Sequence, residues 1–252
     1  MTTIIKHQVK CAVCGHENEE SVVTSTNRKG YMDLDTRPPE MERSTICYRV
    51  WECEECGYVA EHLSDPFPLP AAFLQSGQYL GFGGQVPICG LTAKFIKKAR
   101  IACEMKDYYI AFSDYLGAAW AADDSRDDYW QKESRGLAVL AYEELTKQVA
   151  TAENAMGADD YNLDGFLQTE TGRLFIQILG HFSSPEERVD GIESLSLIVA
   201  DILRRQGHFD IVIRDYSNSN YKNDFSNKIA GFQVEKAKQR DQGRYTIGDI
   251  EA

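Results

Sequence analysis

Two short cysteine pairs constrain this chain more than any other feature. Each has the spacing Cys-x-x-Cys-Gly, at residues 11–15 and at residues 53–57. A tight turn with this spacing projects two thiolates from one loop, and its glycine supplies the positive φ that the turn needs. Two such turns give four sulfurs in the tetrahedral arrangement that Zn²⁺ accepts, with no position left for a catalytic water. The sequence therefore predicts a structural zinc site formed by Cys11, Cys14, Cys53 and Cys56.

Other uses of these cysteines stay open. A tetrathiolate iron centre, as in rubredoxin-like electron carriers, needs the same geometry, whereas a redox dithiol normally needs one pair beside a βαβ pattern. The stretch between Cys14 and Cys53 is longer than usual, which we interpret as a loop insertion with a closure cost under ~1 kcal/mol. The odd total of seven cysteines argues against a disulfide framework. We expect Cys47, Cys89 and Cys103 to be small buried hydrophobic residues.

Charge and hydropathy disfavour two classes of partner. The 252 residues carry a formal net charge of −12, so the whole chain has no field that attracts phosphate backbones. Residues 1–66 hold seven basic and twelve acidic side chains, a net charge of −5. No apolar run approaches the ~20 residues of a membrane-spanning helix, and residues 1–10 lack the pattern of a signal peptide. We therefore expect a cytoplasmic protein that binds neither membranes nor, in general, nucleic acid.

The residue pattern of the sequence changes twice along the chain and predicts three parts. Residues 1–66 contain strand-like segments at 21–24 and 45–51, and we interpret them as a zinc-ribbon-like metal module. Residues 67–90 are a Pro/Gly-rich linker with room for a short helix at 71–80. Residues 91–252 show helical periodicity. The predicted fold class is α+β, with a small β-rich ribbon followed by an α-helical, tetratricopeptide-like array.

Helix signals divide the C-terminal part. Asp127 and Pro185 are helix-start residues, and Gly180 and Gly207 are helix stops. The final residues, 242–252, look frayed. Together with the periodicity that begins at Leu91, these signals predict helices at about 107–122, 126–150, 166–181, 185–205, 209–216 and 224–240.

A charged insertion, Asn27–Arg43, separates the cysteine pairs. It places Asp33 and Asp35 two residues apart, and Arg37 follows closely enough to neutralise Asp35. We favour a self-contained ion-pair network in this loop. A partner-binding loop and a site for a hard catalytic cation are the alternatives, although no phosphate-binding element accompanies the two carboxylates.

Three segments resemble a bacterial family known as domain of unknown function number twenty-two twenty-five. They are the first Cys-x-x-Cys-Gly, the stretch D-L-D-T-R-P-P-E-M-E-R at 33–43, and V-W-E-C-E-E-C-G-Y at 50–58. The tail at 199–210 is similar to the last recognisable segment of that family. Ala12 and Glu54 stand where many ribbon turns have proline. The resemblance implies a zinc ribbon followed by tetratricopeptide-like helices, and it implies no reaction.

Small residues at regular spacing suggest tetratricopeptide-like helix pairs. One frame contains Ala99, Ala111, Tyr115 and Ala118, and a degenerate frame contains Ala200, Val212, Tyr216 and Ser219. An unrelated helical bundle is the alternative. We find no catalytic triad, phosphate loop or dinucleotide fingerprint in the sequence. The predicted function is a non-enzymatic zinc-binding adaptor for another protein; a nucleic-acid-binding ribbon and an enzyme that uses Asp33 and Asp35 are the alternatives. The sequence determines neither the partner nor the oligomeric state.

Overall fold

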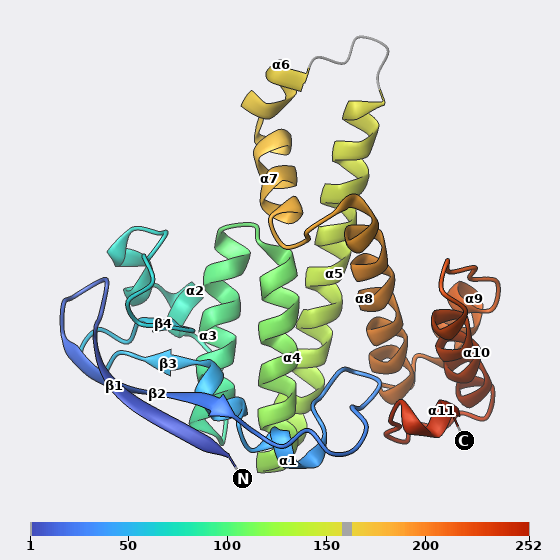
Figure 1. Cartoon of the computed structure of the whole chain (residues 1–252), viewed down its shortest axis with the longest axis horizontal. Helices are drawn as coiled ribbons and strands as arrows, with labels where there is room; N and C mark the ends of the chain where they lie inside the picture. The colour runs from blue at the N-terminus through green and yellow to red at the C-terminus, as the bar shows by residue number, and fades with distance from the viewer. Residues whose placement is uncertain (1, 158–162, 252) are drawn as a thin grey trace. The chain divides into compact units, whose positions relative to one another are not determined.

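The computed structural model describes residues 2–157 and 163–251. Within them the chain forms two compact units that are interleaved in sequence. The N-terminal unit comprises residues 1–30, 38–106 and 110–138, and the C-terminal unit comprises residues 31–37, 107–109 and 139–252. Small two-stranded sheets precede a long series of helices, so the α+β class is confirmed (Figure 1).

Two antiparallel hairpins form the β part of the N-terminal unit. Strand β1 (Thr3–Lys10) pairs with β2 (Glu17–Ser25), and β3 (Trp51–Glu52) pairs with β4 (Val59–Ala60). Each hairpin closes around one cysteine pair. Side chains of β2 alternate between exposed and buried over its first half, as expected for a strand with one covered face.

The insertion between the hairpins is partly helical. Helix α1 (Glu40–Arg43) and the 3₁₀ helix η1 (Ile46–Arg49) occupy it. The strand expected at 45–51 is therefore wrong except for Trp51, which begins β3. A second 3₁₀ helix, η2 (Ala71–Gln75), and α2 (Gly77–Leu80) follow, so the short helix expected at 71–80 is present in two pieces.

Helices α3 (Gly90–Glu104) and α4 (Tyr108–Ser125) pack side by side in the N-terminal unit (Figure 1). Gly117 permits their close approach, because a Cβ at that position would lie 2.7 Å from the ring of Phe95. Most residues of α4 are buried, including Phe112 and Trp120. The first turns of α5 (Asp128–Met156) belong to the same unit, where Arg135 forms a bidentate pair with Asp123 of α4.

The C-terminal unit contains the rest of α5 and the later helices. These are α6 (Leu163–Gln168), α7 (Glu170–Leu179), α8 (Pro185–Arg205), α9 (Phe209–Tyr216), α10 (Asp224–Lys238) and α11 (Gly248–Glu251). The expected helices match closely at 185–205, 209–216 and 224–240. The single helix expected at 166–181 is divided, because the hydroxyl of Thr169 accepts the N–H of Gly172 and begins α7.

The predicted helix boundaries are confirmed at four residues. Asp127 accepts the N–H of Trp130 at the start of α5, and Pro185 occupies the first turn of α8. Gly180 ends α7, and Gly207 has φ of +86° after α8.

The core of the C-terminal unit lies between α8, α9 and α10. Its fully buried members are Ala200, Phe209, Val212, Tyr216, Val234 and Ala237. The terminal segment expected to fray is ordered against residues 31–37: Leu34 N–H donates to Tyr245 O (2.9 Å), and Ile247 N–H donates to Met32 O (2.9 Å). In the described residues, no helix has the length and apolar character needed to cross a bilayer.

The helix pairs α3–α4 and α8–α9 coincide with the two tetratricopeptide-like frames, although the repeat itself stays a prediction. The domain boundaries expected after residues 66 and 90 also stay predictions about independent folding.

Candidate metal centre

Both cysteine turns have the same backbone construction. The N–H of Cys11 donates to the carbonyl five residues later, His16 O (2.9 Å), and the N–H of Cys53 donates to Tyr58 O (2.8 Å). The N–H of each following glycine donates back to the first cysteine of its turn. Gly15 and Gly57 have φ of +74° and +71°, a conformation that side chains disfavour. The glycines are therefore part of the turn geometry.

The two turns bring their four sulfurs together. All four Sγ atoms, those of Cys11, Cys14, Cys53 and Cys56, lie within 4.8 Å of one another. Across the two turns, Cys11 Sγ lies 3.7 Å from Cys56 Sγ, and Cys14 Sγ lies 3.6 Å from Cys53 Sγ. A tetrahedral site with metal–sulfur bonds of about 2.3 Å has sulfurs about 3.8 Å apart. The four residues could therefore hold a metal ion.

Burial and hydrogen bonds divide the thiols into different environments. Cys11 and Cys53 are buried, whereas Cys14 is exposed at the surface. Burial opposes ionisation of Cys53, but the backbone N–H groups of Cys56 and Glu55 outweigh it and lower its pKa to about 6. Burial raises the pKa of Cys56. A thiolate at Cys53 is the charge state that metal binding requires.

Asn18 links the two turns beside the sulfurs. Its Nδ2 donates to Cys53 Sγ (3.7 Å) and to His16 O (3.0 Å), while its Oδ1 accepts the N–H of Glu54 (3.2 Å). One buried side chain on β2 thereby contacts the first turn through His16 and the second through Cys53 and Glu54. No motif in the sequence marks Asn18 as part of the site. The alternation of β2 is the signal that places it on the buried face.

Two further buried groups support the turns. Tyr79 is completely buried and donates from its hydroxyl to Gly57 O (2.7 Å). Burial also raises the pKa of Tyr79, which keeps the phenol protonated as a donor. The carboxylate of Glu20 is buried on β2 and accepts the N–H of Leu63 (2.6 Å), and Leu63 O accepts the N–H of Ala12 in the first turn (2.8 Å).

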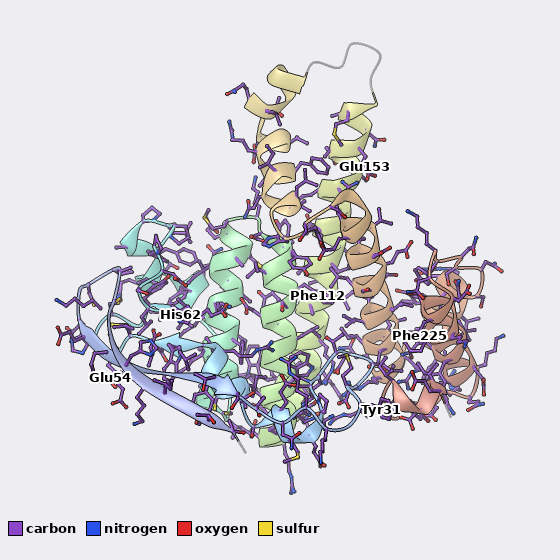
Figure 2. All side chains as sticks on the ribbon, viewed as in Figure 1. Tyr31, Glu54, His62, Phe112, Glu153 and Phe225 are labelled. Carbon is purple, nitrogen blue, oxygen red and sulfur yellow. The ribbon has the colours of Figure 1, made fainter. Side chains whose placement is uncertain are left out.

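The histidines near the cysteine pairs are not among the grouped ligands. His16 is exposed. His62, labelled in Figure 2, is also exposed, and its Nδ1 lies 3.3 Å from the carboxylate of Glu20. The expectation for the remaining cysteines is wrong at Cys47, which is exposed, whereas Cys89 and Cys103 are partly buried.

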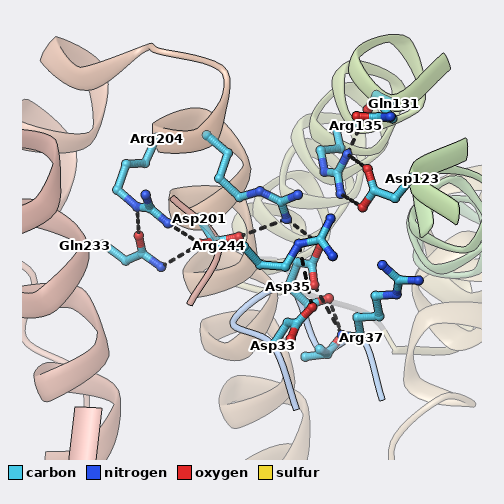
Figure 3. A network of polar contacts seen from close by, with 12 residues as sticks. Asp33, Asp35, Arg37, Asp123, Gln131, Arg135, Asp201, Arg204, Gln233 and Arg244 are labelled. Atoms are coloured by element: carbon cyan, nitrogen blue, oxygen red, sulfur yellow. Dashed lines mark hydrogen bonds and ion pairs between the residues drawn. The ribbon is translucent and has the colours of Figure 1, made fainter. Parts of the chain in front are cut away.

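Residues 33–37 of the insertion belong to the C-terminal unit. Asp33, Asp35 and Arg37 are 2%, 1% and 4% exposed. Arg205 of α8 donates to Asp35 Oδ2 (2.8 Å) and also pairs with Asp201 (3.5 Å). Figure 3 labels both of these carboxylates. The ion-pair network expected here is present, and the N–H of Arg37 donates to Asp35 Oδ1 (3.3 Å). The network is not self-contained, because Arg205, far along the chain, also pairs with Asp35.

Further groups complete this network (Figure 3). Arg204 is fully buried and donates to Asp201 Oδ1 (2.7 Å) and to Gln233 Oε1 (2.6 Å). The guanidinium of Arg244 lies 3.9 Å from the carboxylate of Asp33. Burial, then the nearby charge of Asp35, raises the pKa of Asp201. Carboxylates held this way face arginines rather than solvent, so the geometry gives no support to a substrate-binding or hydrolytic site at Asp33 and Asp35.

Comparison with known proteins identifies one family. Residues 4–66 match the family described as "Uncharacterized protein conserved in bacteria (DUF2225)". The match contains both cysteine pairs and the insertion, and it ends before the tail at 199–210, where a resemblance was also expected. No curated protein and no solved structure matches the chain.

Proposed function

We propose that this chain is a non-enzymatic adaptor in which a structural Zn²⁺ ion, bound by Cys11, Cys14, Cys53 and Cys56, holds together a module that binds another protein. The observation that carries the proposal is the clustering of four sulfurs, all within 4.8 Å of one another, on two matching turns. When bound, the ion would supply cross-linking of the two hairpins. Four thiolates fill the coordination sphere of zinc, so the site would offer no position for substrate.

The surroundings of the sulfurs support a structural role. Asn18, Tyr79 and Glu20 join the turns to each other and to neighbouring segments through hydrogen bonds, and each is buried or nearly so. A site embedded in this way contributes to folding, because the ligands are brought together only in the folded chain.

A rigid apolar loop supports the protein-binding part of the proposal. Val86 and Ile88 are 75% and 73% exposed, although the loop that carries them is well anchored. Trp130 Nε1 donates to Gln85 O (2.7 Å), and the N–H of Ile88 donates to Asp127 Oδ2 (3.0 Å). Exposed apolar side chains on an ordered loop are typical of a protein-interaction surface.

Two measurements test the proposal. For the metal, elemental analysis of the purified chain should give one zinc per chain, and Cys53→Ser should remove it. For the adaptor role, the tagged chain should retain a protein partner in cells of its natural host, and Val86→Asp with Ile88→Asp should weaken that retention. Leu140→Asp, at an exposed position of α5, is the matched control. A salt-sensitive shift of random DNA or RNA at micromolar protein would instead support the nucleic-acid alternative.

A further inference from the structure

A cavity of about 470 Å³ in the N-terminal unit lies beside strand β2 and is separate from the sulfurs. Five consecutive residues of the chain, 22–26, line one wall. Side chains of a strand alternate between faces, so a wall made of consecutive residues is the edge of the strand rather than one face. The rest of the lining comes from Arg28, Glu42, Thr45, Tyr48, Arg49, Glu61 and His62.

The edge of β2 on this side has unpaired backbone groups. In an antiparallel pair, residues with N–H and C=O toward the partner alternate with residues whose groups point away. The hydrogen bond from Cys11 N–H to His16 O shows which residue pairs of the hairpin are hydrogen-bonded. Counting along the register from this bond, Ile5↔Val22 is a hydrogen-bonded pair and Ile4↔Val23 is not. The backbone N–H and C=O of Val22 therefore point toward β1, and those of Val23 point away from it. Among the described residues, no backbone hydrogen bond outside the hairpin involves Val23.

Arg49 gives the cavity one cation with which a carboxylate can pair. Arg28 pairs with Glu42 (3.1 Å), whereas Arg49 is exposed and forms no ion pair in the described part of the chain. Glu61 also lines the cavity and is exposed, so only one part of the groove is cationic. Thr45 and Tyr48, which carry hydroxyl groups, line the same cavity as Arg49.

We propose that this groove, lined by residues 22–26 and by Thr45, Tyr48 and Arg49, binds an extended peptide segment of a partner protein as an additional strand on β2. The outward N–H and C=O groups of Val23 are complementary to another extended backbone. The volume is that of a binding pocket for a few residues. One acidic side chain of the peptide pairs with Arg49. This inference rests on the adaptor function proposed above and adds a peptide-binding groove to the exposed loop of Val86 and Ile88.

The direct test uses the full chain, bound to its metal, and fluorescent heptapeptides of sequence Thr-Val-Thr-Glu-Val-Thr-Val. Two versions of the peptide are N-methylated at alternate amides. In one version methylation removes the N–H groups that face β2, and in the other version, shifted by one residue, it leaves them intact. The first version should lose binding measured by fluorescence anisotropy, and the second should retain it. Equal effects in the two versions, or no binding of the unmodified peptide, would overturn the proposal.

Variants of the protein test the same surface. Val23→Pro removes an outward N–H and should abolish peptide binding. The variant should still fold, because proline is tolerated at a strand edge. Arg49→Gln should weaken binding about threefold and reduce its salt dependence. The Arg49→Gln substitution should not weaken binding of a peptide that has Lys in place of Glu. Lys222→Gln, an equal loss of charge at an exposed site elsewhere, should have no effect.

Failure of this inference is distinguishable from failure of the adaptor proposal. If no peptide binds while Val86→Asp with Ile88→Asp still weakens retention of the cellular partner, the groove is not the binding surface and the adaptor proposal stands. If Val23→Pro fails to fold, the two methylated versions of the peptide on the unaltered protein still decide the question.

Discussion

At the scale of single residues, Arg205 is central to the charge balance of the C-terminal unit. Its guanidinium pairs with both Asp35 and Asp201, and its side chain is only 11% exposed. Replacement by leucine leaves two buried carboxylates without this cation, so Arg205→Leu should lower the free energy of unfolding by about 3 kcal/mol. Urea denaturation monitored by circular dichroism measures it. Arg214→Leu, which breaks an exposed pair with Asp215, should change stability little.

The buried carboxylate of Asp201 gives a pH dependence of unusual sign. Burial and the charge of Asp35 raise its pKa from 3.8 despite Arg204 and Arg205, while Gln233 also faces it. The folded state therefore binds the Asp201 proton more tightly than the unfolded state does. This contribution to stability is complete below pH 3.8 and is lost as the pH rises through the folded pKa.

Comparison with Asp201→Asn isolates this effect. As the pH rises from 4 to 7, the free energy of unfolding of the unaltered protein should fall relative to that of the variant. Denaturation of both proteins over this range is the measurement. A difference that stays constant, or that changes in the opposite direction, would show that the arginines keep Asp201 ionised throughout.

At the scale of elements, the cysteine turns depend on the conformation of their glycines. Gly57 has φ of +71°, and a Cβ there would touch nothing, so Gly57→Ala isolates the backbone cost. It should lower stability of the metal-bound N-terminal unit by about 1 kcal/mol. Gly136 lies in the interior of α5 with equally open surroundings, so Gly136→Ala should raise stability by up to about 1 kcal/mol. Thermal unfolding of both variants should therefore shift in opposite directions.

The sequence predicted helices better than it predicted the segments between them. Apolar periodicity, Asp127, Pro185 and Gly207 located α5, α8 and α9 because these signals are local. The segment 45–51 has β-branched and aromatic residues, yet most of it is the 3₁₀ helix η1. Strand propensity there reflects suitability for a half-buried surface rather than a backbone preference, so tertiary contacts override it.

The candidate metal centre was predictable only at its ligands. Cysteine spacing alone identified the four thiols, because two of them lie on each tight turn. The supporting groups contact residues that are distant in sequence. Asn18 contacts Cys53, 35 positions away, Glu20 contacts Leu63, 43 positions away, and Tyr79 contacts Gly57, 22 positions away. No local pattern encodes such contacts. The partner of Asp35 was missed for the same reason, since Arg205 lies 170 residues along the chain.

At the scale of the whole molecule, the insertion between the cysteine pairs is shared between the two compact units. Residues 31–37 belong to the C-terminal unit, where they bond to the final segment through Tyr245 O and Ile247 N–H. Truncation after Asp241 removes these bonds and Arg244, and it should destabilise the C-terminal unit. Hydrogen exchange should report faster exchange in α8 and α10, with the cysteine turns unchanged.

Metal content is the measurement that tests the central claim most directly. We expect one zinc per chain by elemental analysis and native mass spectrometry, and none in Cys53→Ser. Chelation of the ion should unfold the hairpins while most of the helical circular dichroism remains, because the sulfurs join only those hairpins. A purified chain with four free thiols, a folded ribbon and no bound metal would contradict a structural zinc ion at these four cysteines. So would stoichiometric iron with a red colour, which would make the site an electron-transfer centre.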